Sequence, residues 1–152
     1  MGVRLDRQTS SQWHGTPRLS LVWQPTQAWV IKALAGEAYR EPNFYERAPA
    51  VAGESWNDTL RRERVRSCEL AADWRADERL RFSASLFDNR VHDLIEQVPR
   101  DDGVLIYRNV GAAHSRGIEF EGEYLAAAGW RLRASLTRQR VRLEDGGEPS
   151  NA

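Results

Sequence analysis

Apolar and polar residues alternate with a period of two along most of this sequence, and no other feature constrains the fold as strongly. Successive side chains of a β-strand point to opposite faces, so this period predicts strands with one apolar and one polar face. Clusters of Gly, Pro, Asp and Asn separate the alternating runs, as turns do. We therefore expect an all-β fold, an antiparallel up-and-down meander of about seven long strands. These strands are placed over residues 2–7, 16–24, 28–38, 64–74, 79–98, 103–125 and 129–142.

The connections between the predicted strands differ in length. Outer-membrane barrels have short periplasmic turns and longer extracellular loops, so this difference predicts which end of each strand faces the cell exterior. The loop over 39–63 would lie outside the cell. A tight turn at 101–103 joins the two longest predicted strands. Three other connections are short, at 25–27, 75–78 and 126–129. Two are longer, at 8–15 and 39–63.

Five aromatic residues stand beside the three short connections and belong to the apolar phase of their strands: Trp23, Trp29, Trp74, Tyr124 and Trp130. Trp and Tyr rings prefer the headgroup level of a membrane, so these residues predict a membrane-interface girdle at one end of the sheet. A soluble sandwich would alternate equally well, and the girdle favours the membrane barrel. The rest of the apolar phase comprises Leu19, Leu21, Ile31, Ala33, Ala35, Cys68, Leu70, Ala72, Leu80, Phe82, Ala84, Leu86, Ile118, Phe120, Gly122, Leu132, Ala134 and Leu136.

The opposite phase carries charged residues on two successive strands. Glu119, Glu121 and Glu123 precede Arg131 and Arg133 on the next strand, which predicts acidic and basic ladders that face each other. They would pair with each other or with a separate plug domain. The alternative is that they form the polar lining of a substrate path.

Composition excludes several classes of protein. Lys and Arg together number 22 and Asp and Glu together also 22, without the basic excess of a nucleic-acid-binding protein. Cys68 is the only cysteine, and His14, His92 and His114 lack the spacing of metal ligands, so we expect neither a metal nor a cofactor. Neither a Gly-x-Ser-x-Gly elbow nor a phosphate-binding glycine loop occurs, so no enzyme activity is expected. After Met1 the sequence lacks a secretory signal, so the protein is cytoplasmic or its start is missing.

Four segments carry motifs in an order and rough spacing that one known family shares. They are TPRLSLVWQP at 16–25; YREPNFYE at 39–46; LRRE at 60–63 with SCEL at 67–70; and SLF at 85–87, DLI at 93–95 and NVG at 109–111 before GIEFE at 117–121. Together these segments resemble the TonB-dependent receptor family. Two departures are Arg62, where the family usually has proline, and Cys68, where an aromatic residue is common.

The resemblance implies that residues 1–152 are part of a barrel of about 22 strands, without a plug domain or a closing C-terminal strand. It also implies a receptor of the cell outer membrane that takes up a scarce nutrient, such as a ferric siderophore or cobalamin. The implied partners are outer-membrane lipid, a small metal chelate or vitamin, and the TonB energy-coupling protein acting through the plug. Two alternatives stay open: a soluble lipocalin-like ligand-binding barrel, and a non-transporting outer-membrane barrel such as a porin or adhesin.

The loop over 39–63 carries the candidate ligand-binding residues. Its aromatic and arginine side chains suit stacking on, and pairing with, an anionic chelate. The alternative, which we prefer for Arg40, Pro42 and Glu46, is that they fix the conformation of the loop itself. The candidates are Tyr39, Arg40, Phe44, Tyr45, Arg47, Trp56, Arg61 and Arg62.

Overall fold

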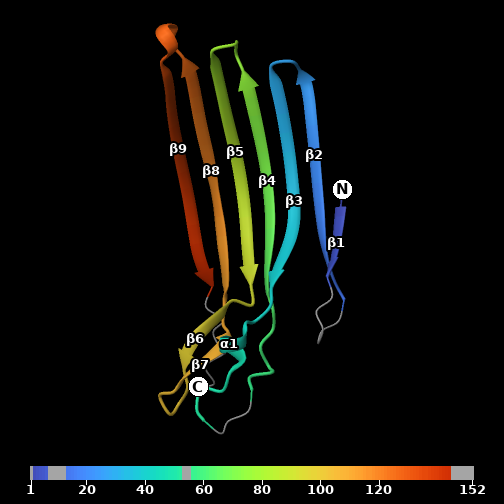
Figure 1. Ribbon diagram of the computed structural model, residues 1–152, viewed down its shortest axis with the longest axis vertical. Helices are drawn as coiled ribbons and strands as arrows, with labels where there is room; N and C mark the ends of the chain where they lie inside the picture. The colour runs from blue at the N-terminus through green and yellow to red at the C-terminus, as the bar shows by residue number, and fades with distance from the viewer. Residues whose placement is uncertain (1, 7–12, 53–55, 145–152) are drawn as a thin grey trace. The chain divides into compact units, whose positions relative to one another are not determined.

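A computed structural model of the chain describes residues 2–6, 13–52 and 56–144. Seven strands form one sheet in the order β1-β2-β3-β4-β5-β8-β9, while β6 and β7 form a separate two-stranded sheet (Figure 1). The elements are β1 (Gly2–Asp6), β2 (His14–Thr26), β3 (Trp29–Arg40), α1 (Phe44–Arg47), β4 (Glu63–Arg75), β5 (Leu80–His92), β6 (Ile95–Pro99), β7 (Leu105–Asn109), β8 (Ala112–Leu125), the 3-10 turn η1 (Ala127–Gly129) and β9 (Arg131–Glu144).

The chain divides into two compact units, each described separately below. The first combines Met1–Glu37, Arg66–Asn89 and Ser115–Val141, and the second combines Ala38–Val65, Arg90–His114 and Arg142–Ala152. Most of the seven-stranded sheet belongs to the first unit. The second unit holds α1 and the hairpin of β6 and β7.

The apolar phases of neighbouring strands share one face of the sheet in the first unit. The antiparallel register of β2 and β3 places Trp23 opposite Ile31. Trp74 on β4 stacks on Trp29 of β3, with ring centroids 5.7 Å apart, and Phe82 on β5 stacks on Trp74 at 5.8 Å. We call this surface the apolar face and its reverse the polar face.

A groove on the apolar face extends over β8 and β9, so those strands present the same phase. Its volume is about 460 Å³. It is lined by Trp29, Ala72, Trp74, Phe82, Ser83, Ala84, Phe120, Glu121, Gly122, Ala134, Ser135 and Leu136. Five strands therefore contribute to one continuous apolar surface.

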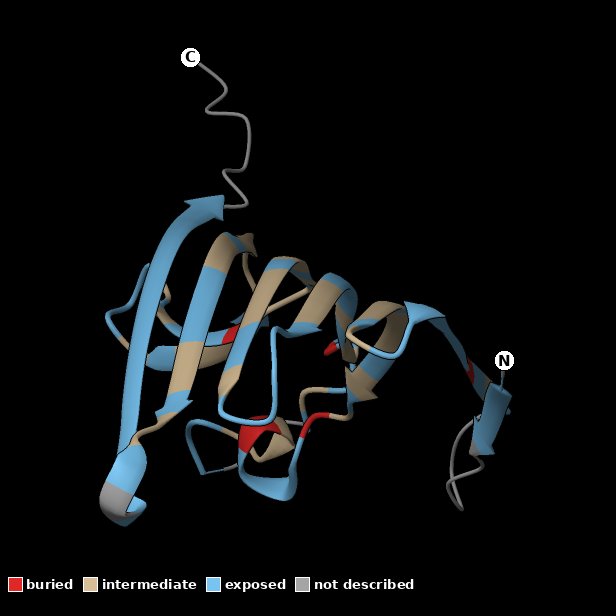
Figure 2. Ribbon diagram, turned by 90° about the horizontal axis from the view of Figure 1, so that it is seen from above, coloured by how far each residue is buried: buried red, intermediate tan, exposed pale blue. Residues whose placement is uncertain are grey.

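Large side chains of the apolar face are open to the surroundings. Leu21 is 64% exposed, Leu136 67% and Trp130 71%. Exposed strand residues recur along the sheet, whose two edges do not meet (Figure 2). Among the described residues, the buried apolar ones are Leu60 and Ile95, both in the second unit. Since soluble monomers rarely expose apolar patches of more than a few hundred Å², the apolar face requires a covering from outside the described chain.

No helix within residues 2–6, 13–52 and 56–144 has the length and apolar character needed to span a membrane.

The prediction of an open all-β meander is confirmed, but the two longest predicted strands, over 79–98 and 103–125, are each broken. Asp93 adopts a φ of 58° between β5 and β6, and Gly111 a φ of 83° between β7 and β8. Left-handed backbone of this kind cannot continue a strand. The tight turn at 101–103 therefore closes a separate short hairpin, β6 and β7. Most of the predicted connection at 8–15 lies outside the described residues.

Gly117 on β8 generates a prediction about packing on the polar face. A Cβ atom there would lie 2.6 Å from the backbone oxygen of Arg138 and 2.6 Å from Phe87 Cζ. We expect Gly117→Ala to lower the free energy of unfolding by about 1–3 kcal/mol, because the backbone of β9 would have to shift. Urea unfolding in detergent micelles, followed by tryptophan fluorescence, measures this change.

Gly36→Ala is the matched control. A Cβ atom at Gly36 would meet Arg18 Cγ at 3.4 Å, an ordinary van der Waals contact, so we expect little change. Equal effects of the two substitutions would contradict the close approach of β8 and β9.

Candidate functional site

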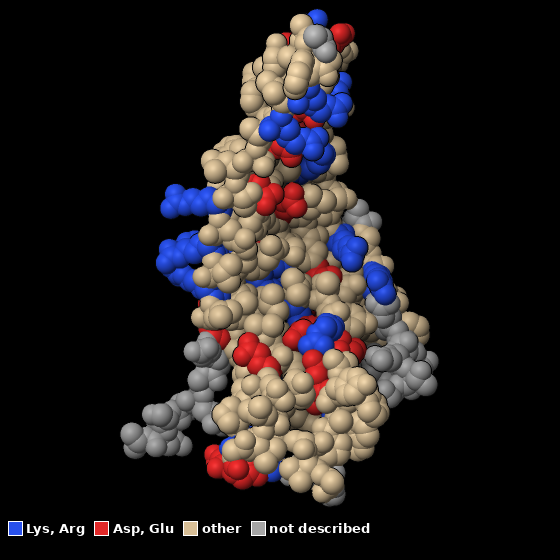
Figure 3. Space-filling view, turned by 60° about the vertical axis from the view of Figure 1, so that its left-hand side comes forward, with Lys and Arg blue, Asp and Glu red and all other residues tan. Residues whose placement is uncertain are grey.

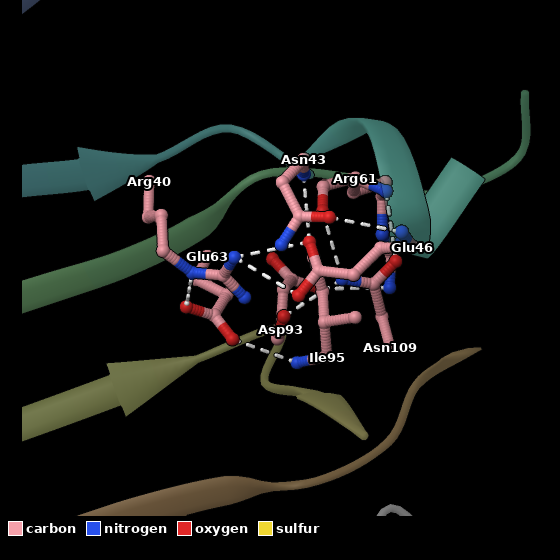
Figure 4. A network of polar contacts seen from close by, with 8 residues as sticks. All are labelled: Arg40, Asn43, Glu46, Arg61, Glu63, Asp93, Ile95 and Asn109. Carbon is pink, nitrogen blue, oxygen red and sulfur yellow. Dashed lines mark hydrogen bonds and ion pairs between the residues drawn. The ribbon is translucent and has the colours of Figure 1, made fainter. Parts of the chain in front are cut away.

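The long loop over 39–63 is held to the β6–β7 segment by a polar network in the second unit (Figure 4). Glu63 is its centre. One carboxylate oxygen accepts a hydrogen bond from Arg40 Nε at 2.6 Å, and the other accepts one from the backbone N–H of Ile95 at 2.9 Å. A single side chain thus joins the end of β3, the start of β4 and the start of β6.

The same network fixes the start of α1. Asn43 caps the helix by accepting a hydrogen bond from the backbone N–H of Glu46 at 3.0 Å, and Glu46 accepts one from the backbone N–H of Asn43 at 2.7 Å. This reciprocal pair is a capping box. Arg40 Nη1 lies 3.0 Å from the Glu46 carboxylate, which is only 10% exposed. Arg40 and Glu46 therefore fix the conformation of the loop, as expected, and the contact of Arg40 with a ligand stays a prediction.

Asn109 forms a second tie between the loop and the hairpin. Its side-chain oxygen accepts a hydrogen bond from the backbone N–H of Arg61, and its nitrogen donates to the backbone oxygens of Arg61 and Asp93, all within 2.7–2.8 Å. Arg61 also forms an ion pair with Asp93 at 2.8 Å. Asn57 adds a hydrogen bond to the backbone oxygen of Tyr107 at 2.8 Å. Residues distant in sequence are thereby locked into one small framework.

Glu63 is charged in this setting at neutral pH. The Arg40 hydrogen bond, aided by the Ile95 N–H and opposed by partial burial, holds the pKa of the Glu63 carboxyl below its ordinary value of 4.5. In the hairpin turn, the Arg100 guanidinium lowers the pKa of Asp102 to about 2. Both carboxylates therefore keep their ion pairs over the whole physiological pH range.

Three aromatic residues of the loop form an exposed cluster beside this framework. Phe44 makes edge-to-face contacts with Tyr45 and Trp56, with centroid separations of 5.8 and 4.9 Å. Tyr45 is 79% exposed, Phe44 67% and Trp56 47%. Because large rings rarely remain this open without a partner, the cluster suits stacking on a flat ligand.

Tyr45 and Trp56 also line a hollow of about 460 Å³ in the second unit. The hairpin supplies further lining residues, among them Arg100, Tyr107 and Arg108. Sequence reasoning missed these because it predicted two long strands over 79–98 and 103–125, joined by a tight turn, and no separate hairpin beside the loop. The aromatic and basic residues of the hairpin were the sequence signal that could have identified them as part of the site. An anionic aromatic molecule would find both stacking surfaces and positive charge here.

The other predicted ligand residues are distributed differently. The Arg62 guanidinium lies 5.1 Å from the centre of the Tyr39 ring and forms an ion pair with Glu41 at 3.2 Å. Neither Tyr39 nor Arg62 lines the hollow, nor do Arg40, Arg47 and Arg61. The structure therefore brings together only part of the predicted set.

On the polar face of the first unit, the predicted acidic and basic ladders do pair. Arg133 lies 3.2 Å from Glu121 and 2.9 Å from Glu123, and Arg131 lies 3.8 Å from Glu123. Intermixed basic and acidic side chains are visible in Figure 3. A further ion pair on this face joins Lys32 of β3 to Asp73 of β4 at 2.7 Å. These charges satisfy one another across neighbouring strands.

The five predicted girdle residues lie at the short connections of β2–β3, β4–β5 and β8–β9, which share one end of the sheet in Figure 1. All are substantially exposed: Trp23 59%, Trp29 39%, Trp74 38%, Tyr124 43% and Trp130 71%. Their position is thus compatible with contact with a lipid headgroup layer. Among the described residues, no group of three or more His, Cys, Asp and Glu is arranged to hold a metal ion.

Comparison with known proteins gives one family. A family model described as TonB dependent receptor-like, beta-barrel matches residues 1–151. No curated protein sequence matches the chain.

Solved structures give the same fold. The siderophore receptor PirA from Pseudomonas aeruginosa superposes with a TM-score of 0.79 at 20% identity, over 91% of this chain and 27% of that one. The FrpB iron transporter from Neisseria meningitidis, F3-3 variant, gives 0.72 at 20% identity over 89% and 21%. The alcaligin outer membrane receptor FauA from Bordetella pertussis gives 0.63 at 22% identity over 93% and 24%. The chain thus spans about a fifth to a quarter of each of these proteins.

The central position of Glu63 generates a prediction about the loop. The lowered pKa means that its stabilising contribution is present above pH 4.5 and is lost as pH falls through the lower pKa of the folded state. Glu63→Gln should reproduce this loss at neutral pH by removing the charged hydrogen bond, a change of about 1–3 kcal/mol in local opening. Hydrogen exchange of the Ile95 amide measures it.

Glu37→Gln is the control, because Glu37 forms a comparable ion pair with the exposed side chain of Arg66 at 3.0 Å in the first unit. We expect it to leave exchange at Ile95 unchanged. Unaltered exchange of the Ile95 amide in Glu63→Gln would contradict the central role of Glu63 in the network.

Proposed function

Because the chain belongs to the TonB-dependent receptor-like β-barrel family, we propose that it forms part of the wall of an outer-membrane receptor that takes up a scarce nutrient. The match over residues 1–151 is the observation that carries this proposal. Members of the family are outer-membrane receptors that transport small molecules and depend on TonB, not enzymes. A ferric siderophore is the cargo class that we propose first, with cobalamin second. PirA is a siderophore receptor, and FauA is an outer membrane receptor for alcaligin.

The proposed orientation places lipid against the apolar face and the aromatic girdle at the periplasmic headgroups. An apolar band about 25 Å tall, flanked by aromatic residues, is the outer surface of such barrels. Exposed Leu21, Trp130 and Leu136 suit that environment. The polar face, with its paired charges, would line the interior. The strand ends opposite the girdle then carry the long connections on the extracellular side.

The proposed barrel is larger than this sheet, whose edges are open among the described strands. Energy coupling through TonB, and the plug on which it acts, belong to the proposed whole receptor. A soluble lipocalin-like barrel would bury its apolar phase inside a closed sheet, so the exposed apolar face supports the membrane alternative. A porin or adhesin would share the girdle but not the family match.

Ligand capture is assigned to the aromatic cluster and the hollow beside it. Tyr45 and Trp56 offer ring faces, while Arg100 and Arg108 offer positive charge to an anionic chelate. Arg40 and Glu63 act indirectly by holding the loop and the hairpin together.

Membrane exposure of the apolar face predicts a contrast between adjacent residues of β9. Ala134→Arg should destabilise the folded protein in lipid vesicles by about 2–4 kcal/mol. Ala134 lies on the apolar face four residues beyond the girdle residue Trp130, or about 10 Å along the membrane normal, which is near the middle of an apolar band about 25 Å tall. Ser135→Arg, on the polar face, should lower the free energy of unfolding by less than about 1 kcal/mol. Urea unfolding in vesicles gives both values. Equal costs, or the reverse order, would contradict the orientation.

Ligand capture predicts weaker binding when the rings are removed from the whole receptor. Titration with a ferric catecholate, a ferric hydroxamate and cobalamin should identify one probe that quenches tryptophan fluorescence. For that probe, Tyr45→Ala and Trp56→Ala should each raise Kd about tenfold, which corresponds to roughly 1.4 kcal/mol. Trp130→Ala in the girdle is the control and should leave Kd unchanged. An equal effect of all three substitutions would contradict capture by the loop.

A further inference from the structure

The tip of the β6–β7 hairpin is a tight turn with a fixed backbone. The N–H of Arg100 donates to the backbone oxygen of Val104, and the N–H of Gly103 donates to the backbone oxygen of Arg100, both at 2.8 Å. Gly103 adopts a φ of 81°, which glycine accepts without strain. Asp102 lies inside this turn, so its backbone is held in place by the residues on either side.

Asp102 binds the Arg100 guanidinium across the turn. Arg100 Nε donates to both carboxylate oxygens of Asp102 at 3.0 Å, and Arg100 Nη2 donates to Oδ2 at 2.6 Å. Oδ1 also accepts a hydrogen bond from the backbone N–H of Val104 at 3.1 Å, which fixes the carboxylate. The pair is partly exposed and adds little to stability, but it orients the guanidinium.

The Arg100 guanidinium can serve more than one oxyanion. An arginine side chain carries more N–H donors than a single carboxylate accepts, and its planar fork matches the oxygens of carboxylates and related anions. Arg100 lines the hollow of the second unit, whereas Asp102 does not. Asp102 therefore acts on a ligand in the hollow through Arg100.

The hairpin also presents a ring surface to the hollow. Gln97 lies opposite Tyr107 in the register of β6 and β7, and alternation places Leu105 on the same face as Tyr107. These three residues line the hollow together with Tyr45 and Trp56 of the loop. Its volume of about 460 Å³ suits a single aromatic group, such as one arm of a larger chelate.

The other charged residues that line the hollow differ from Arg100. Glu46 forms an ion pair with Arg40 at 3.0 Å. Arg108 is exposed and lies opposite Glu96 in the register, and no hydrogen bond or ion pair with a described residue orients it. An unrestrained arginine loses rotamer entropy when it binds an anion, whereas an oriented one loses less. Arg100 is therefore the preorganised cation of the hollow.

We propose that Arg100 determines the specificity of the hollow and that Asp102 positions Arg100, so that the hollow selects an aromatic ring that carries an oxyanion. The inference rests on the ligand capture proposed above and names the chemical class that this site takes. A ring without charge, or a charge without a ring, makes only part of the contacts.

Titration of the whole receptor in detergent with benzoate, benzamide and cyclohexanecarboxylate, followed by saturation-transfer NMR, tests this specificity. Benzamide lacks the charge of benzoate, and cyclohexanecarboxylate lacks its aromatic ring. We expect benzoate to bind about tenfold more tightly than benzamide, because of the charged hydrogen bonds to Arg100. It should bind about fivefold more tightly than cyclohexanecarboxylate, because of ring stacking. Equal binding of benzoate and either other probe would overturn the proposal.

Substitutions in the turn test the two assigned roles. Arg100→Gln should abolish the preference for benzoate over benzamide, and Asp102→Asn should reduce that preference about fivefold. Asp101→Asn is the matched control, because it removes the same charge from the same turn at a residue that does not line the hollow. It should retain the preference.

Three results would contradict these roles. An unchanged preference in Arg100→Gln would remove the specificity from Arg100. Tighter benzoate binding in Asp102→Asn would show that Asp102 competes with the ligand. Equal weakening of benzoate and benzamide in either variant would show a purely structural role.

Trp56→Ala separates this inference from the proposed function. It removes a ring surface without changing charge, so it should weaken benzoate and benzamide equally. If it does so while Arg100→Gln leaves the preference unchanged, the hollow captures ligands but the assignment of specificity is wrong. If neither aromatic probe binds the unaltered receptor, ligand capture by the hollow and its specificity are both refuted.

Discussion

The apolar face of the seven-stranded sheet imposes the constraint on which the rest of the structure depends. Five strands direct Leu, Phe, Trp and Ala side chains to one side, and no described segment of the chain covers them. Leaving such an area in water is costly, at about 25 cal/mol for each Å² of apolar surface. In the proposed orientation, lipid removes that cost without a second layer of protein. The stacked rings of Trp29, Trp74 and Phe82 then mark where the apolar layer ends.

The second unit differs from the sheet because polar contacts hold it together. Glu63 accepts hydrogen bonds from two segments, and Asn109 joins the loop to the hairpin. A rigid framework of this kind leaves the rings of Tyr45 and Trp56 exposed without requiring the loop to order on binding. Preorganisation of this type lowers the entropic cost of capturing a ligand.

Sequence periodicity was sufficient for the seven-stranded sheet and for its two faces, because side-chain alternation is a local property of each strand. The position of the five aromatic residues at the short turns and the pairing of Arg133 with Glu123 followed from the same alternation. The prediction from periodicity was wrong where a single residue changes the path of the chain. Asp93, a non-glycine residue with a φ of 58°, ends β5 inside an otherwise continuous pattern. Contacts such as Asn109 with Arg61 join residues far apart in sequence, and no local pattern predicts them.

The native cysteine offers the most direct test of which face meets lipid. Cys68 is exposed and belongs to the apolar phase of β4, and its neighbour Glu69 belongs to the polar phase. A nitroxide label on Cys68 of the whole receptor in lipid vesicles should collide frequently with oxygen and rarely with a water-soluble nickel chelate. A label on Glu69→Cys in a Cys68→Ser background should show a higher ratio of nickel to oxygen collisions. Equal ratios at the two positions, or the opposite order, would contradict a lipid-facing apolar surface.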